Sequence, residues 1–434
     1  MTTAGHGDIL NADMMENLLV EKFLRRLTAS RRSSKRLLIT ALGLVLVIAS
    51  VSVFVRKSAP LAAKQPAVGP PVLSVGGNAG VDSCRFLTVS SDGSVVGAIS
   101  AGGVLHVFDW QGQPVFSAPL KTHNRAALAP GGKFTLLYSH RDLSNTSVTF
   151  LDSSGREHSS MDVGSAVWSA DGVLTDGGVR FAIGTGAGMV YIVDLSRSGR
   201  RHKRWRVPGA VVSVSMDSDG QQVNYGCWQR SVVGCATWSG EKRWEEKTDP
   251  SVLNYVERLS ASRTACVLVP NRSGSAGSLW IMRGDGEKLW ETKVGQSARP
   301  KAVIAKNGRY VCRSYSRAIR HERNTVVERH GVLVESPGKT LWDKGSLFFQ
   351  ADPLFVTSSG YVVVVGSKNR LYILSRTGEV KPSLELPSRL RLAVSVRNGA
   401  KLVIYCSDGS IHMLDLTEQQ PRHSIEAAVP TRLG

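Results

Sequence analysis

Residues 278–290 read SLWIMRGDGEKLW. A strand-like run leads into a turn that ends at Gly286, and a tryptophan follows four residues later. The same order of strand, turn glycine and large aromatic returns as GQPVF at 112–116, GEKRW at 240–244 and GKTLW at 338–342. A unit that recurs in this way predicts a repeat protein.

The repeat has a regular period. Successive turn glycines are 43, 44, 41, 46, 52 and 40 residues apart. A second turn signal, Asp-Gly or Asn-Gly between apolar runs, accompanies most units, as in SSDGSVV at 90–96 and AKNGRYV at 305–311. An eighth copy, at 411–419, lacks the glycine. The turn glycines are Gly112, Gly155, Gly199, Gly240, Gly286, Gly338 and Gly378.

Units of 40–50 residues with three or four short strands are typical of a β-propeller. One blade cannot bury both of its faces alone, whereas a closed ring of blades buries them and leaves few open edges. Eight copies between residues 83 and 416 therefore predict an all-β ring of eight four-stranded blades. Seven blades are the alternative, because the fifth unit lacks its first-turn glycine and the sixth is long. Either 71–78 or 423–429 is expected to supply the strand that closes the ring.

The aromatic after the turn glycine predicts a structural position on the outer strand, packed against the neighbouring blade. The residues concerned are Phe116, Trp244, Trp290 and Trp342, four residues after the glycine, and Trp205, six residues after it. This spacing resembles the docking motif of the quinoprotein-type, or PQQ-like, β-propeller repeat. SDGSIHMLDL at 407–416 resembles WD-type repeats equally well.

The resemblance implies the non-catalytic branch of that family, with no cofactor. Enzymes of the family resemble one another in an adjacent pair of cysteines and a calcium site of Glu, Asn and Asp. In this chain the six cysteines are isolated from one another. The sequence also has no CxxC, no metal-type histidine spacing and no GxSxG. We therefore predict no catalytic, cofactor-binding or metal-binding residue.

Two of the cysteines flank a predicted hairpin. Cys227 and Cys235 bound the segment YGCWQRSVVGC. A disulfide between facing strands is one interpretation, and a pair of buried, apolar thiols is the other.

One segment is long and apolar enough to cross a membrane. Residues 37–55, LLITALGLVLVIASVSVFV, contain nineteen residues without a charge. Seven basic residues precede this run and two follow it closely, so the N-terminus is expected in the cytoplasm and the rest outside. We predict a basic cytoplasmic segment (1–36), a transmembrane helix (37–55), a Pro/Ala/Gly linker (56–82) and a propeller domain (83–430). A cleaved signal peptide and a twin-arginine export signal are the alternatives.

The chain is strongly basic, with 54 Lys and Arg against 35 Asp and Glu and a net charge of +19 at pH 7. Two clusters are predicted in longer connections on the rim or an end face. A solvated surface and a site for an acidic partner, such as anionic lipid, a cell-wall polymer or an acidic protein, are the alternatives. Nucleic acid is not expected, because no helix-turn-helix or RNA-binding signature is present. The first cluster is Arg197, Arg200, Arg201, Lys203, Arg204 and Arg206, and the second is Arg313, Arg317, Arg320, Arg323 and Arg329.

These features predict a protein of the cytoplasmic (inner) membrane, single-pass, with its propeller outside. It would act as a protein-binding scaffold or sensor without catalysis, because a rigid ring presents many loops on one face. A quinoprotein-like or hydrolytic enzyme with its site at the propeller channel is one alternative. A single-pass receptor whose first 36 residues contact a cytoplasmic partner is the other.

Overall fold

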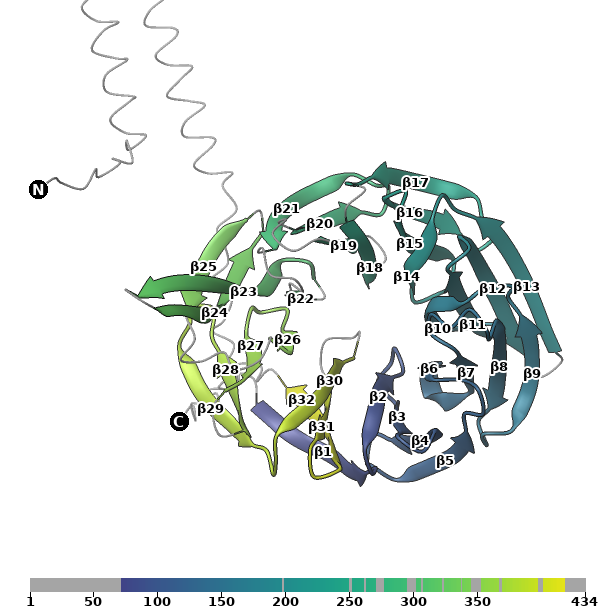
Figure 1. The fold of residues 1–434 in the computed structure, drawn as a ribbon, viewed down its shortest axis with the longest axis horizontal. Helices are drawn as coiled ribbons and strands as arrows, with labels where there is room; N and C mark the ends of the chain where they lie inside the picture. Colours follow the sequence, from purple (N-terminus) through teal and green to yellow (C-terminus); the bar gives the residue numbers. More distant parts are fainter. Residues whose placement is uncertain are drawn as a thin grey trace, which may run out of the picture. The chain divides into compact units, whose positions relative to one another are not determined.

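A computed structural model describes most of the chain between residues 72 and 417. These residues belong to one compact unit, Val68–Gly434. In it, eight four-stranded antiparallel sheets stand as blades around a central opening (Figure 1). The predicted eight-bladed β-propeller is therefore confirmed. The described stretches are 72–196, 199–249, 252–260, 263–270, 277–294, 302–305, 307–321, 324–336, 338–344, 353–366, 369–396 and 401–417.

In blades 1–7 the four strands follow the chain outward, from the innermost strand at the central opening to the outermost strand (Figure 1). Blade 1 is β2 (Cys84–Val89), β3 (Val95–Ser100), β4 (Val104–Asp109) and β5 (Pro114–Pro119). Blade 2 is β6 (Arg125–Leu128), β7 (Phe134–Tyr138), β8 (Ser147–Asp152) and β9 (Glu157–Asp162), with the 3₁₀ turn η1 (Pro130–Gly132) after β6. Blade 3 is β10 (Val167–Thr175), β11 (Gly178–Thr185), β12 (Met189–Ser196) and β13 (Gly199–Arg206). Blade 4 is β14 (Ala210–Met216), β15 (Gln222–Trp228), β16 (Val232–Thr237) and β17 (Lys242–Lys247).

The second half of the ring repeats this plan. Blade 5 is β18 (Val252–Ser260), β19 (Arg263–Pro270), β20 (Gly277–Arg283) and β21 (Lys288–Val294). Blade 6 is β22 (Ala302–Ile304), β23 (Tyr310–His321), β24 (Asn324–Glu335) and β25 (Lys339–Lys344). Blade 7 is β26 (Phe355–Val356), β27 (Val362–Val365), β28 (Arg370–Leu374) and β29 (Val380–Glu385). Blade 8 combines β30 (Leu390–Ser395), β31 (Lys401–Cys406) and β32 (Ser410–Thr417) with β1 (Val72–Gly80) as its outermost strand.

β1 closes the ring by pairing with β32, from Val72↔Thr417 to Gly80↔Ser410. Of the two closing segments considered from the sequence, the N-terminal one is therefore the one used. This pairing also corrects the predicted boundary at residue 83, because 72–80 belong to the propeller and not to a linker. Their glycines and alanine weakened the strand signal, and the partner strand that decides their structure lies at the far end of the domain.

Short turns with special backbone geometry connect the strands. At the β2–β3 turn, Gly93 has a φ of 70°, which a residue with a Cβ adopts only at a cost. Asp92 accepts hydrogen bonds from the Ser94 amide at 3.1 Å and from the Ser90 hydroxyl at 2.6 Å. The Asp-Gly signal in the sequence therefore corresponds to a real hairpin turn here.

The core is a series of apolar layers between neighbouring blades. Leu136 and Phe150 of blade 2 pack with Phe181 and Ile183 of blade 3 in one cluster of buried residues. The ring centres of Phe150 and Phe181 are 5.8 Å apart. The middle strands of a blade bury both of their faces, so β3 and β11, for example, are buried almost without alternation.

Blade 6 contains two strands of twelve residues each, β23 and β24, which pair with each other from Tyr310↔Glu335 to His321↔Asn324. Their hairpin extends past the last pairs made with β22 and β25, and it projects from the ring in Figure 1. The long sixth unit of the sequence is thus one extended hairpin and not an extra blade.

The predicted transmembrane helix at 37–55 lies outside the described residues, as does the basic segment before it. Within the described stretches, no helix has the length and apolar character needed to cross a bilayer.

Candidate functional site

The first basic cluster forms the outermost strand of blade 3. Arg200, Arg201, Lys203, Arg204 and Arg206 all lie on β13, whereas Arg197 is outside the described residues. The expectation of a long connection was therefore wrong, because these residues pair along the whole of β12. An outermost strand faces solvent along its edge, so it accommodates charged residues that an inner strand could not.

Two of these cations take part in contacts between blades. The Arg200 guanidinium donates a hydrogen bond to the Ser160 carbonyl of blade 2. The Lys203 Nζ atom lies 3.6 Å from the ring centre of Trp238 in blade 4. Alternate residues of a strand point to opposite faces, which explains why these two side chains reach blades on opposite sides.

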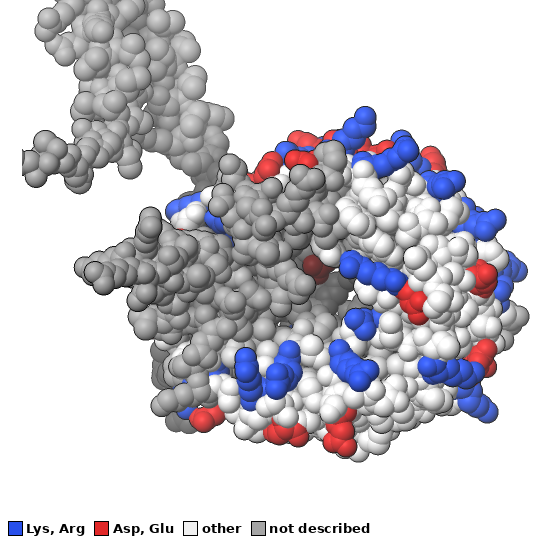
Figure 2. Space-filling view, viewed as in Figure 1, with Lys and Arg blue, Asp and Glu red and all other residues white. Residues whose placement is uncertain are grey.

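Three further cations of β13 point to solvent. Arg201, Arg204 and Arg206 are exposed, and no hydrogen bond or ion pair joins their side chains to another described residue. We call these three residues the basic strip. Figure 2 shows that Lys and Arg side chains also gather around the rim and the central opening on the visible face of the ring.

The predicted docking tryptophans are buried on outer strands. Trp244, Trp290 and Trp342 lie on β17, β21 and β25. Each indole N–H donates to a main-chain carbonyl beyond its own blade. The acceptors are Gly284 for Trp244 at 3.1 Å, Gly308 for Trp290 at 3.3 Å and Ser375 for Trp342 at 2.9 Å.

Four of the seven turn glycines pack against the aromatic side chain of the preceding blade. Phe116 lies against Gly155, and Trp205 lies against Gly240. A Cβ at either glycine would come within 3.2 Å of the ring that covers it. The same relationship joins Trp244 to Gly286 and Trp342 to Gly378. Of the remaining three, Gly112 lies against the Asn78 carbonyl of β1, and Gly199 and Gly338 have no atom within 4 Å of a Cβ position in the described structure.

The structure does not join Cys227 to Cys235, so the disulfide considered from the sequence is wrong. Cys227 pairs with Val232, whereas Cys235 pairs with Asn224. Cys227 is three positions from Asn224 along β15, so the two cysteines lie on opposite faces of the sheet. Both thiols are fully buried, and all six cysteines of the chain lack a disulfide.

The second basic cluster lies in blade 6. Arg313, Arg317 and Arg320 are positions of β23, and Arg329 is a position of β24. Arg323 falls outside the described residues, and of the others only the Arg313 side chain is described; it is half-buried. The second basic cluster was predicted to lie on a connection, and its described positions lie instead on the two strands of a hairpin.

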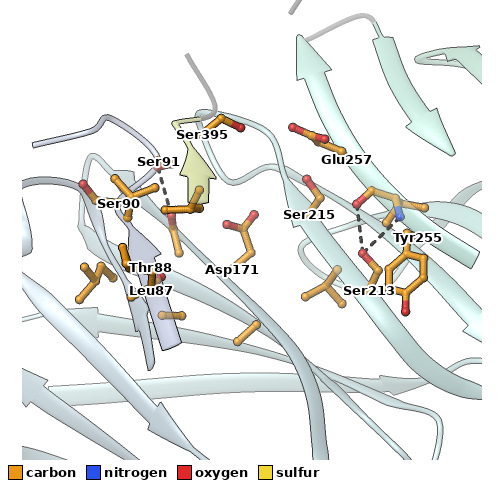
Figure 3. A pocket seen from close by; sticks show the side chains of 18 of the residues that line it. Leu87, Thr88, Ser90, Ser91, Asp171, Ser213, Ser215, Tyr255, Glu257 and Ser395 are labelled. Atoms are coloured by element: carbon orange, nitrogen blue, oxygen red, sulfur yellow. Dashed lines mark hydrogen bonds between the residues drawn. The ribbon is translucent and has the colours of Figure 1, made fainter. Parts of the chain in front are cut away.

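The central channel holds a cavity of about 490 Å³ that is lined by the innermost strands of six blades. Hydroxyl groups dominate its polar lining, and Asp171 and Glu257 supply the carboxylates (Figure 3). No Lys, Arg or His is among the described residues that line it.

Several of these polar groups bind the backbone of the next blade. The Met216 amide donates to Asp171 Oδ2 at 2.7 Å. The Ser213 hydroxyl donates to the Val256 carbonyl at 3.1 Å and accepts from the Val256 amide at 3.2 Å (Figure 3). The innermost strand of a blade has one edge without a partner strand, so these side chains satisfy backbone groups that would otherwise be unpaired.

A second cavity, of about 660 Å³, opens between blades 3 and 4 at the end of β13. Sequence reasoning missed it, because its residues come from several separate strands and turns between β13 and β17. Its lining includes Trp205, Arg206, Tyr225, Arg230, Lys242 and Glu245. The described residues contain no group of three His, Cys, Asp or Glu side chains arranged to hold a metal ion.

The comparisons with known proteins show the fold. No protein-family model matches the chain, and no curated protein matches it in sequence. The Dos1 propeller has a TM-score of 0.58 at 13% sequence identity, and the match covers 79% of this chain and 95% of that one. BamB from Moraxella catarrhalis has a TM-score of 0.52 at 13% identity, covering 81% of this chain and 99% of that one. At this identity the similarity establishes a β-propeller and nothing further.

Proposed function

We propose that this chain is a non-catalytic scaffold that binds an acidic protein partner through the basic strip of blade 3. The observation that carries the proposal is that Arg201, Arg204 and Arg206 are exposed on one outer strand, and that their side chains form no ion pair with another described residue. Burying such a strip against carboxylates satisfies guanidinium groups that otherwise only water solvates.

The electrostatics favour recognition over long distance. The whole chain carries +19, and a positive surface raises the rate at which an acidic partner is captured. This attraction extends about 8 Å at physiological salt. Binding through the strip should therefore weaken as salt rises.

The channel supports a structural role for its polar groups. Ser213 and Asp171, which would be candidate catalytic residues in a hydrolase, are engaged by the backbone of the adjacent blade. A nucleophile or base committed in this way is not available to a substrate without breaking a contact between blades. This arrangement favours the scaffold over the enzyme as a proposal.

The location and the repeat type complete the proposal. The apolar run 37–55 would anchor the chain in the cytoplasmic membrane, with the propeller outside. The packing of the indole of one blade against the glycine of the next supports the quinoprotein-type repeat.

The proposed orientation in the membrane can be tested by proteolysis. Protease added to intact spheroplasts should degrade residues 60–434, and protection of that domain would contradict the orientation.

The binding proposal is tested with the full chain in a non-ionic detergent. Poly-glutamate should bind at low salt and be released as salt is raised. Arg201→Gln with Arg204→Gln should weaken that binding without lowering the melting temperature. If the variant binds poly-glutamate as tightly as the parent chain does, the basic strip is a solvated surface and not a binding site.

A further inference from the structure

The cavity between blades 3 and 4 lies where two turns meet the end of β13. One side is the β13–β14 connection, with Val207 and Pro208, and the other is the β15–β16 turn, with Arg230. Tyr225 and Ala236 are buried residues of its lining. Trp205 adds a half-buried aromatic wall. The lining therefore combines apolar and aromatic side chains with four charged ones, Arg206, Arg230, Lys242 and Glu245.

The backbone around Arg230 is held in an unusual conformation. Gln229 has a φ of 72° and Ser231 a φ of 47°, although neither is glycine. Left-handed geometry costs a residue with a Cβ about 1–2 kcal/mol. Gly209 is packed against this turn so closely that a Cβ there would clash with the Trp228 carbonyl at 2.1 Å. Residues held in such conformations cluster at active sites, ligand-binding sites and switch regions.

The charges of the pocket do not balance. Its carboxylate, Glu245, accepts a hydrogen bond from the Tyr225 hydroxyl at 3.0 Å and lies 3.7 Å from Lys242 Nζ. The side chains of Arg206 and Arg230 have no hydrogen-bond or ion-pair partner in the described part of the chain. Two guanidinium groups therefore border one cavity whose acidic group is already engaged.

We infer that this pocket binds a carboxylate side chain of an acidic peptide segment in the partner protein. The planar guanidinium groups of Arg206 and Arg230 can each hold a carboxylate through two parallel N–H···O bonds. Trp205, Val207 and Pro208 would cover an apolar neighbour of the acidic residue. This inference rests on the proposed scaffold function and assigns its anchoring contact.

The test uses the full chain in non-ionic detergent and a fluorescein-labelled peptide of alternating glutamate and leucine. A peptide of alternating glutamine and leucine is the ligand control. The pocket variant is Arg206→Gln with Arg230→Gln. The strip variant is Arg201→Gln with Arg204→Gln. A matched control, Lys339→Gln with Arg391→Gln, removes two exposed cations from blades 6 and 8.

Fluorescence anisotropy should show tighter binding of the glutamate peptide than of the glutamine peptide. The pocket variant should weaken binding about tenfold or more, as expected for the loss of charge-assisted hydrogen bonds. The strip variant should weaken it less, and the matched control by less than about twofold. Arg206→Lys with Arg230→Lys, which keeps the charge and removes the planar fork, should give an intermediate loss.

Three outcomes would overturn parts of this inference. If the strip variant weakens binding and the pocket variant behaves like the matched control, the scaffold proposal stands and the pocket assignment fails. If the two peptides bind alike, both fail. If inorganic phosphate displaces the peptide at a concentration about tenfold below that of acetate, the ligand class is phosphate and the carboxylate assignment is wrong. All variants should keep the melting temperature of the parent chain.

Discussion

Trp244 of blade 4 lies directly against Gly286 of blade 5, and a Cβ at position 286 would sit 2.7 Å from the indole Cγ atom. Gly240, which stands four residues before Trp244 in the sequence, instead lies against Trp205 of blade 3. Each reaches a different neighbour, so the spacing links one blade to both the blade before it and the blade after it.

Gly286→Ala should destabilise the propeller more than Gly338→Ala. Both glycines have a left-handed backbone, with φ of 96° and 117°, so alanine is strained at either position. Only position 286 adds a clash with an indole, whereas a Cβ at 338 meets no atom of the described structure within 4 Å. Overpacking should add about 1–3 kcal/mol. Thermal melting of the two variants measures the difference, and equal shifts would contradict the packing role.

Replacing tryptophan by phenylalanine should cost more stability at position 244 than at position 205. Trp244→Phe removes the bond to the Gly284 carbonyl and should cost about 1–2 kcal/mol beyond the lost area. The Trp205 Nε1 atom is buried with no hydrogen-bond partner among the described residues, so Trp205→Phe should cost less. Trp244→Ala should cost about 3–5 kcal/mol. A larger loss at 205 than at 244 in chemical denaturation would refute this account.

Stability should fall as pH drops from about 6.5 to 4, in part because of His140. Burial first, and then Arg141 and Arg125, lower the pKa of His140 to about 4. The unfolded chain therefore takes up a proton at this position before the folded chain does, so the contribution is complete above pH 6.5 and is lost as pH falls through 4. His140→Asn should flatten the melting temperature over that interval. An unchanged pH profile would show that another group controls it.

Cys227 and Cys235 should stay unlinked under mild oxidation. They lie on opposite faces of their sheet, and burial raises the pKa of the Cys227 thiol to about 12. A thiol that stays protonated and buried does not react with a disulfide or with iodoacetamide at pH 8. Cys84, which is half-buried, should be modified first. Peptide mapping without reductant checks both statements, and a 227–235 cross-link would contradict them.

The architecture could be predicted because it depends on local, repeated chemistry. Turn signals such as Asp92-Gly93 recur in most units, and an aromatic like Trp290 recurs in five of them, so the eight units leave little choice of fold. The place of the basic cluster could not be predicted in the same way. Six charges in ten residues are typical of a loop, whereas Arg200 to Arg206 form a strand that pairs with β12, the strand just before it in the chain.

The cavity between blades 3 and 4 was invisible for a related reason. Arg206, Arg230 and Lys242 belong to three different segments, and no spacing in the sequence marks them. The turn around Arg230 carries no glycine, so its left-handed residues, Gln229 and Ser231, give no composition signal. Sequence patterns report the repeated positions, and the site depends on positions where one unit differs from the others.

The closing strand also sets the order in which the domain can be completed. Val72 pairs with Thr417, so 345 residues (417 − 72) separate the two partners. During synthesis β1 is made first among the strands and β32 last, and the seven blades between them can form while β1 still has an unpaired edge. Ring closure is therefore a late event of high contact order. A chain that stops before Ser410 leaves β1 as an open strand, which is a template for pairing between molecules.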